Sequence, residues 1–112
     1  MDARFSVKKN SDFRRIYAKG KSFVTPCLVV YSRKNRSDVN RVGFTVSAKL
    51  GNAVCRNRTR RRLREIYRLN SSRLAPGHDI ILVARSRAVN ADYTALNEAF
   101  LECCRNLELC GK

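Results

Sequence analysis

Acidic residues and histidine are scarce in this chain of 112 residues, which contains nine Asp and Glu and a single His. A protein that hydrolyses phosphodiesters needs clustered carboxylates for metal ions, or a general base with a tuned pKa. Here the acids are scattered, with no D-x-D, D-x-E or H-x-D pair. Most of the aspartates fall at expected element boundaries or in loops, where caps and turns are common. We therefore expect neither catalytic residues nor a metal site in the protein itself.

Long apolar runs are also absent. No segment approaches the ~20 apolar residues that a membrane-spanning helix needs, and the first residues, MDARF, lack the apolar region of a secretory signal. We expect a cytoplasmic protein. A length of 112 residues fits one domain with a single core, and 44% hydrophobic with 29% charged residues is a globular balance.

The cysteines form neither a metal-binding nor a disulfide pattern. There are five, no C-x-x-C pair occurs, and His78, which we expect in a turn, is the one histidine available to complete a zinc site. In a cytosolic protein thiols stay reduced. We predict free, partly buried thiols at Cys27, Cys55, Cys103, Cys104 and Cys110.

Positive charge is abundant. Lys and Arg number 24, which gives a formal net charge of +15 and a pI near 10.5. Such an imbalance destabilises a compact state through self-repulsion, so a polyanion is the natural partner. Nucleic acid is the first candidate, and an anionic membrane surface is the second.

Apolar periodicity predicts helices packed on a sheet, an α+β sandwich. We expect helices over about 12–19, 53–69 and 92–109, and strands over 27–33, 41–47 and 79–85. Ser11 and Asn52 are the expected N-caps of the first two helices, and Gly20 ends the first. We expect residues 34–40 to join the first two strands as a hairpin, and the third strand, apolar on both faces, to be central. Residues 1–10 are expected to form a loosely ordered basic arm.

Two elements show clear faces. Val42, Phe44 and Val46 alternate with Gly43, Thr45 and Ser47, so the two sets point to opposite sides of a strand. In the last helix the expected apolar face consists of residues three and four apart, namely Tyr93, Leu96, Phe100, Cys103 and Leu107.

The helix over 53–69 is rich in arginine, with six among the nine residues from 56 to 64. At about 100° per residue, one side carries Cys55, Thr59, Leu63, Ile66 and Tyr67, and the opposite side carries Asn57, Arg60, Arg61, Arg64 and Arg68. Like charges four residues apart cost roughly 0.2–0.5 kcal/mol per pair, and only Glu65 is near enough to compensate. Arginine suits bidentate phosphate binding. We infer that this face contacts nucleic acid, and RNA rather than DNA, because no helix-turn-helix or zipper context surrounds it.

These residues resemble the bacterial ribonuclease P protein family. The resemblance rests on R-V-G-F-T-V-S (41–47) with Lys49, and on the run G-N-A-V-x-R-N-R-x-x-R-x-x-R-E (51–65), which includes Arg60 and Arg61. S-D-F (11–13) with Tyr17 and Gly20 fits the family as well. It spans nearly the whole chain, as one domain over 1–112. It implies an α-β-β-β-α-β-α two-layer sandwich with a left-handed βαβ crossover, ribosomal protein S5 domain 2-like. Periodicity alone finds one strand fewer.

The resemblance also implies two binding surfaces. The expected RNA-binding residues are Arg56, Asn57, Arg58, Arg60, Arg61, Arg64, Arg68 and Lys49. The expected cleft for the single-stranded 5′ leader of precursor tRNA contains Phe13, Tyr17, Tyr31 and Thr45, with Lys49 nearby. Phe13 and Tyr17 are four apart and share a helix face, where rings stack on bases or simply belong to the core. For Phe13 both readings stay open.

By this resemblance the chain is the protein component of an endoribonuclease that removes the 5′ leader from precursor tRNA. The resemblance further implies that the RNA subunit carries the chemistry and holds most of the Mg²⁺, while the protein binds the leader and raises substrate and metal-ion affinity. The expected partners are the catalytic RNA and the precursor tRNA leader, with neither membrane nor DNA. Two alternatives remain: a structural RNA-binding protein such as a ribosomal protein, and a metal-dependent nuclease, which the scattered acids argue against.

Overall fold

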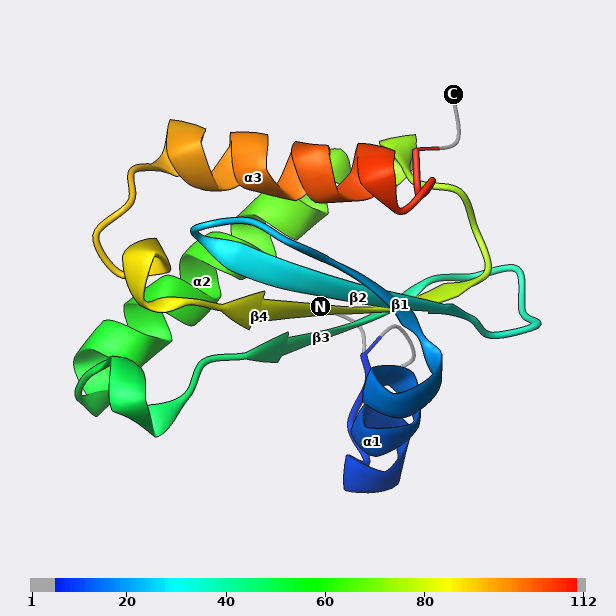
Figure 1. The fold of residues 1–112 in the computed structure, drawn as a ribbon, viewed down its shortest axis with the longest axis horizontal. Helices are drawn as coiled ribbons and strands as arrows, with labels where there is room; N and C mark the ends of the chain where they lie inside the picture. Colours follow the sequence, from blue (N-terminus) through cyan, green and yellow to red (C-terminus); the bar gives the residue numbers. More distant parts are fainter. Residues whose placement is uncertain (1–5, 111–112) are drawn as a thin grey trace.

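A computed structural model describes residues 6–110 and has the predicted element order (Figure 1). The main elements are α1 (Asn10–Lys19), β1 (Lys21–Val24), β2 (Leu28–Lys34), β3 (Arg41–Thr45), α2 (Ala53–Asn70), β4 (His78–Ala84) and α3 (Tyr93–Asn106). Short 3-10 turns lie at Ala48–Leu50, Ser71–Arg73 and Ser86–Ala88. The α+β class and the α-β-β-β-α-β-α order are confirmed.

The four strands form a mixed sheet in the order β1-β2-β4-β3. β4 is antiparallel to β2 and parallel to β3. It is central, as predicted, because it is apolar on both faces: Ile80 and Leu82 enter one core and Ile81 enters another. The predicted hairpin between β2 and β3 is wrong, since β4 lies between these two strands. A strand covered on both sides takes the middle of the sheet in preference to a sequence neighbour.

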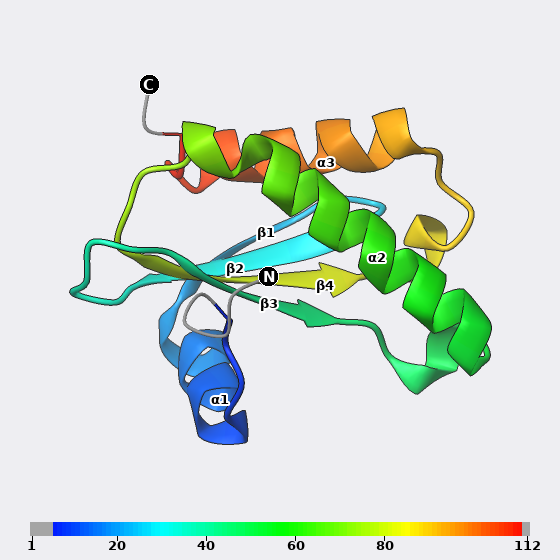
Figure 2. The ribbon, with the colours of Figure 1, turned by 180° about the vertical axis from the view of Figure 1, so that it is seen from behind.

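The connection from β3 through α2 to β4 is a left-handed crossover. With α2 in front, as in Figure 2, β3 and β4 both run to the right and β4 lies above β3. Such connections are right-handed in about 98% of cases. The handedness therefore follows from the family resemblance and from nothing in the composition or spacing.

The strand that periodicity missed is β1, which pairs with β2 through a tight turn at Thr25 and Pro26. The buried Thr25 hydroxyl donates to the Leu28 carbonyl (2.8 Å) and accepts from the Leu28 N–H (3.0 Å). This turn divides the apolar stretch 23–32 into two short strands, so only the second was recognisable.

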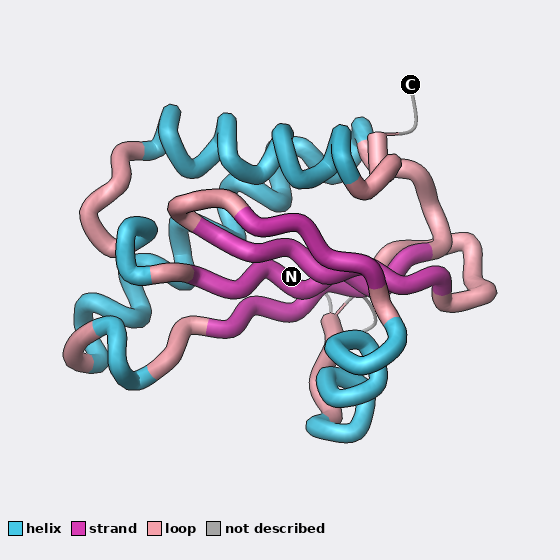
Figure 3. The backbone as a smooth tube through the Cα atoms, viewed as in Figure 1, coloured by secondary structure: helices cyan, strands magenta, loops and turns pink. Residues whose placement is uncertain are grey.

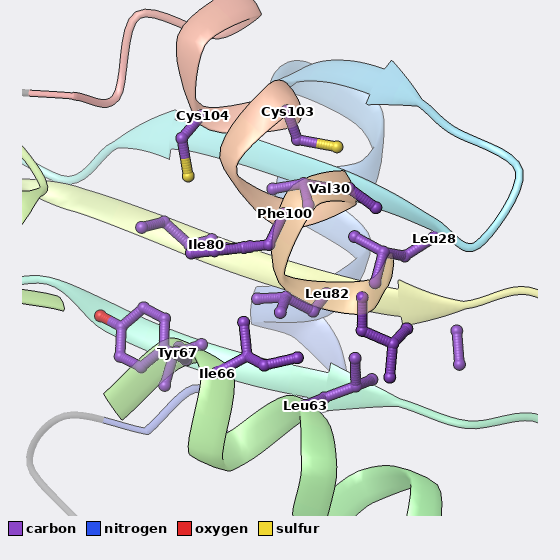
Figure 4. Close-up of a cluster of buried hydrophobic side chains, with 14 of the residues drawn as sticks. Leu28, Val30, Leu63, Ile66, Tyr67, Ile80, Leu82, Phe100, Cys103 and Cys104 are labelled. Carbon is purple, nitrogen blue, oxygen red and sulfur yellow. The ribbon is translucent and has the colours of Figure 1, made fainter. Parts of the chain in front are cut away.

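Helices cover both faces of the sheet. Figures 1 and 3 show α2 and α3 on one face and α1 on the other. The larger core lies under α2 and α3, where Phe100, Leu63 and Ile66 meet Ile80 and Leu82 of β4 (Figure 4). The smaller core, under α1, consists of Val7, Ile16 and Ile81, with Phe13, Tyr31 and Val83 packed against it.

The helix ends were predicted with mixed success. The Asn52 side chain accepts from the Cys55 N–H (2.9 Å), which confirms Asn52 as the cap of α2. Ser11 is not the cap of α1: the N–H groups of Asp12 and Phe13 donate to the Lys9 carbonyl, so the helix begins at Asn10. Gly20 ends α1 as predicted, because a Cβ there would lie 2.6 Å from two carbonyl oxygens.

The expected basic arm, residues 1–10, lies partly outside the described residues, which begin at Ser6. From Ser6 onward the segment lies against the sheet. Val7 is buried, and its N–H donates to the Val42 carbonyl (2.9 Å) at the edge of β3. Burying this apolar side chain stabilises the docked segment, and the loose order of the arm as a whole stays a prediction.

The five cysteines are free, as predicted. Burial raises the pKa of the Cys103 and Cys104 thiols to about 12, so both remain protonated and unreactive at neutral pH. None of the helices formed by residues 6–110 has the length and apolar character needed to cross a membrane.

The larger core should dominate stability. Phe100 is fully buried, and its ring centroid lies 6.4 Å from that of Tyr67. We expect Phe100→Ala to lower the free energy of unfolding by about 3–5 kcal/mol, measured by urea denaturation. Phe100→Leu should lose much less, and Val54→Ala, at a position 74% exposed on α2, should change it little. Equal losses for Phe100→Ala and Val54→Ala would contradict this assignment of the core.

Candidate nucleic-acid interface

The two predicted faces of α2 are confirmed. Thr59, Leu63, Ile66 and Tyr67 are buried against the sheet and α3. The outward side chains form what we call the arginine ridge. In it Asn57, Arg58, Arg61, Arg64 and Arg68 are exposed, whereas Arg56 and Arg60 are half-buried. The buried face fixes the rotation of the helix, and the ridge then points to solvent.

Most guanidinium groups of the ridge are not neutralised by acids. Within residues 6–110, the only arginine of α2 in an ion pair is Arg68, which Glu65 binds through both carboxylate oxygens (2.6 and 3.1 Å). That interaction lowers the pKa of the exposed Glu65 carboxyl. The ridge thus keeps a strong positive field, which is what binding to phosphates requires.

Several ridge residues are held by neutral contacts that preserve their charge. Arg60 donates to the Asn57 side chain (3.1 Å), and Arg56 donates to the Gly51 carbonyl (3.2 Å). Arg64 lies over the Phe44 ring, with 5.8 Å from its guanidinium carbon to the ring centroid. These contacts orient the side chains, so less conformational entropy is lost when they bind a ligand.

On the other face of the sheet, the predicted cleft residues come together as an aromatic cluster. The Tyr17 ring centroid lies 6.2 Å from that of Phe13 and 4.8 Å from that of Tyr31. The Tyr17 hydroxyl is hydrogen-bonded to the Thr45 hydroxyl at 3.0 Å. Tyr17 is 38% exposed and the other three are half-buried. The cluster therefore presents aromatic surface to solvent.

Phe13 belongs both to the core and to the surface. One side of its ring packs on β3 at Gly43, where a Cβ would lie 2.8 Å from the ring, and on the smaller core. With Tyr17 and Thr45 it also lines a surface hollow of about 370 Å³. Phe13 is therefore a core residue that is also accessible at the surface, and its contact with a base stays a prediction.

The same hollow contains two residues that sequence reasoning missed, Asn10 and Arg14. Together with Phe13 and Tyr17 they follow the spacing i, i+3, i+4, i+7, which places all four on one face of a helix. That spacing is visible in the sequence, but a helix that begins only after Ser11 leaves Asn10 out of the pattern. Arg14 adds an exposed positive charge beside the rings.

The ridge and the cluster meet at β3, the edge strand. A hollow of about 320 Å³ there is lined by Phe13 and Gly43 from the cluster side and by Phe44, Arg60 and Arg64 from the ridge side. Lys49 is exposed in the 3-10 turn between β3 and α2. One continuous surface around this edge therefore combines aromatic rings with cations, the combination that binds single-stranded nucleic acid.

The acidic residues serve structural roles. Asp79 accepts from Arg41 through both oxygens (2.9 and 2.7 Å) and from Asn35 (3.0 Å), while Arg41 also lies 3.6 Å from Asp12. Burial alone would raise the pKa of Asp79, but these hydrogen bonds outweigh it and hold the pKa below its ordinary value. The predicted turn position of His78 is wrong: it is the first residue of β4 and pairs with Lys34 of β2, with its ring near the Ala75 carbonyl. Residues 6–110 contain no group of three His, Cys, Asp or Glu able to hold a metal ion.

Comparisons with known proteins agree with this arrangement. A family model described as Ribonuclease P matches residues 1–108. The ribonuclease P protein component of Alkaliphilus metalliredigens is 39% identical over 109 residues, which is 97% of this chain and 98% of that protein. The one from Clostridioides difficile is 46% identical over 94 residues, 83% of this chain and 82% of that protein.

Solved structures give the same result. The RNase P protein of Staphylococcus aureus superimposes with a TM-score of 0.87 at 35% identity, covering 96% of this chain and 98% of that one. The protein from Thermotoga maritima gives a TM-score of 0.79 at 33% identity, covering 87% and 92%.

The Arg41–Asp79 pair should make stability depend on pH. Because the folded-state pKa of Asp79 is lowered, its contribution is complete above the unfolded value near 3.9 and is lost as pH falls below it. We expect Asp79→Asn to cost roughly 1–3 kcal/mol at pH 7. In urea titrations at pH 3, the difference in the free energy of unfolding between this variant and the wild type should be smaller than at pH 7. Asp38→Asn, in an exposed loop, should match the wild type at both pH values. If that difference were the same at pH 3 as at pH 7, the ion pair would be excluded as its cause.

Proposed function

The chain belongs to the bacterial ribonuclease P protein family, and from this premise we propose that it binds the RNA subunit of ribonuclease P through the arginine ridge. As a member of this family it is a component of an endoribonuclease complex that processes tRNA. The observation that carries the proposal is the single outward face of α2, on which most guanidinium groups have no acidic partner among the described residues. The proposed RNA contacts are Arg56, Asn57, Arg58, Arg60, Arg61, Arg64, Arg68 and Lys49.

The aromatic cluster is proposed to hold the single-stranded 5′ leader of precursor tRNA. Stacking on an aromatic ring is tolerant of sequence because every base has a flat face, and leaders differ in sequence. Tyr17 offers the most exposed ring, and Arg14 supplies a charge for the backbone. Phe13, Tyr31 and Thr45 fix the position of Tyr17 through ring contacts and the hydroxyl–hydroxyl bond.

In this proposal the RNA subunit performs the hydrolysis and holds most of the Mg²⁺. The donor set of the protein does not suit that ion: Mg²⁺ prefers carboxylate oxygens, and Asp79 and Glu65 are occupied by arginines. The contribution of the protein is electrostatic. By neutralising phosphates near the reacting bond, it allows the negatively charged leader and catalytic RNA to approach, which raises substrate and metal-ion affinity.

A purely structural RNA-binding protein, such as a ribosomal protein, is the less favoured alternative. The family model and the relatives name ribonuclease P throughout, and the aromatic cluster gives the chain a second surface suited to a flexible strand. A structural RNA-binding protein needs no such surface.

Reconstituted cleavage tests the function. With ribonuclease P RNA and a precursor tRNA at low Mg²⁺, the wild-type protein should stimulate 5′ cleavage. The triple variant Arg60→Ala, Arg61→Ala, Arg64→Ala should bind the RNA more weakly and flatten the slope of log K against log[salt] by about 0.7–0.9 for each phosphate that is no longer neutralised.

The matched control removes the same charge elsewhere. Arg73→Ala, Arg87→Ala, Arg105→Ala replaces three exposed arginines outside α2 and should largely keep the affinity and the slope. If the wild type gave no stimulation, the structural alternative would replace the proposal. Cleavage without the RNA would assign the chemistry to the protein.

A second prediction tests binding of the leader separately from binding of the rest of the precursor tRNA. Tyr17→Ala should weaken binding of precursor tRNA with a long leader by about 5- to 150-fold, since one stacked base contributes ~1–3 kcal/mol. Tyr17→Phe retains the ring, loses the bond to Thr45, and should stay close to the wild type. With leaderless tRNA the three proteins should bind equally. The same loss with leaderless tRNA would contradict a leader site at this cluster.

A further inference from the structure

A groove of about 610 Å³ runs along the outer side of α2 to the first turn of α3. Figure 2 shows this side, with α2 in front and the first turn of α3 (orange) behind it. Its lining includes Arg58, Arg61, Arg68 and Ser71 from the α2 side and Tyr93 from α3. The groove lies on the opposite side of the sheet from the aromatic cluster, so it is a separate surface.

Tyr93 is an exposed aromatic residue at this groove. The periodicity of the last helix assigns it to the apolar face, but it is 42% exposed, whereas Leu96 and Phe100 on the same face are fully buried. Among the described residues it has no hydrogen bond and no aromatic partner. Its ring therefore contributes less to the core than its place in the pattern predicts and is free to contact a ligand.

Two polar links hold α3 beside the ridge, so the groove is preformed. Arg62 is half-buried and donates to the Ala91 carbonyl in the loop before α3. Farther along, the Asn70 side chain donates to the Asn97 side chain (2.8 Å) and to the Ile66 carbonyl (2.8 Å). The charge-assisted bond of Arg62 diverts it from the ridge and fixes the distance between Tyr93 and the exposed arginines.

The groove combines a flat apolar surface with net positive charge, because the one acid in its lining, Glu65, is paired with Arg68. The walls are largely apolar, formed by the Tyr93 ring and the methylene stems of arginines, while the guanidinium groups of Arg58 and Arg61 have no partner among residues 6–110. A site for phosphate alone needs no such apolar wall. A nucleotide uses both parts, because its base stacks on a ring and its phosphate pairs with guanidinium.

We propose that this groove binds an unpaired nucleotide of the RNA subunit, with its base stacked on Tyr93 and its flanking phosphates on Arg58 and Arg61. The inference rests on the proposed function, since it requires RNA on the ridge, and it adds a base-stacking pocket to a surface otherwise suited to phosphates. A base within a helix is already covered on both faces, so only an unstacked nucleotide fits. The volume of the groove lies within the range of sites that hold small ligands.

Affinity for ribonuclease P RNA tests the stacking. Tyr93→Ala should weaken it by about 5- to 150-fold, the loss of one stacked base, while the salt slope stays unchanged because no charge is removed. Tyr93→Phe should bind within about twofold of the wild type, since the ring remains. The control Leu69→Ala removes a half-exposed apolar side chain on α2 that does not line the groove, and it should have no effect on affinity. Thermal unfolding of each variant separates loss of binding from loss of fold.

The outcomes separate this inference from the proposed function. If the triple ridge variant binds weakly but Tyr93→Ala binds like the wild type, the ridge stands and the nucleotide pocket is excluded. If the triple variant binds like the wild type, the proposed function itself fails.

A fluorescent variant identifies the ligand directly. The chain has no tryptophan, so Tyr93→Trp introduces a single reporter. An unstructured single-stranded RNA should quench it at lower concentrations than a duplex of equal length, while pyrophosphate and an acidic peptide should not. Equal quenching by the duplex or by pyrophosphate would show that the groove binds anions without stacking a base. Quenching by the peptide would indicate a protein partner. Each of these results would overturn the proposal.

Discussion

The structure depends on the burial of the inner face of α2, which fixes where its arginines point. Four like-charged pairs at i,i+4 spacing on this helix together cost at most about 2 kcal/mol. Burying one leucine or isoleucine contributes about 1.5–3 kcal/mol, and both Leu63 and Ile66 are fully buried. The packing of two side chains therefore offsets the repulsion among the arginines. A helix that would be unfavourable alone becomes a rigid support for unneutralised charge.

The sheet topology places the two proposed binding surfaces, the arginine ridge and the aromatic cluster, next to each other. β3 is an edge strand whose alternate residues face opposite layers: Phe44 lies under Arg64 of the ridge, while Gly43 and Thr45 contact the aromatic cluster. The left-handed crossover leaves β3 at the edge and brings β4 to the centre. Both surfaces therefore share β3. An RNA strand that passes around this edge of the sheet would contact the aromatic rings and then the guanidinium groups.

What could be predicted from the sequence follows from how local each signal is. The faces of α2 and the central position of β4 are predictable, because a long periodic or fully apolar segment shows by its own pattern which of its sides are buried. The pairing of β2 was not, because its partner is some 50 residues away and the intervening polar loop suggested a hairpin. β1 was hidden by Pro26, and the handedness came only from family resemblance. Periodicity places Tyr93 on the apolar face because it does not show where a helix extends past the core.

The distribution of acids explains how a small protein keeps so high a positive charge on the arginine ridge. Asp79 and Glu65, the acids in its strongest ion pairs, are bound to Arg41 and Arg68, so they strengthen the scaffold while leaving Arg58, Arg61 and Arg64 uncompensated. The resulting self-repulsion is a standing cost to the folded state. A polyanion that binds only the folded chain removes part of that cost and stabilises the fold by mass action. If RNA binds the ridge as proposed, folding stability and RNA affinity are coupled through the same arginines, and charge that is unfavourable in the free protein becomes favourable in the complex.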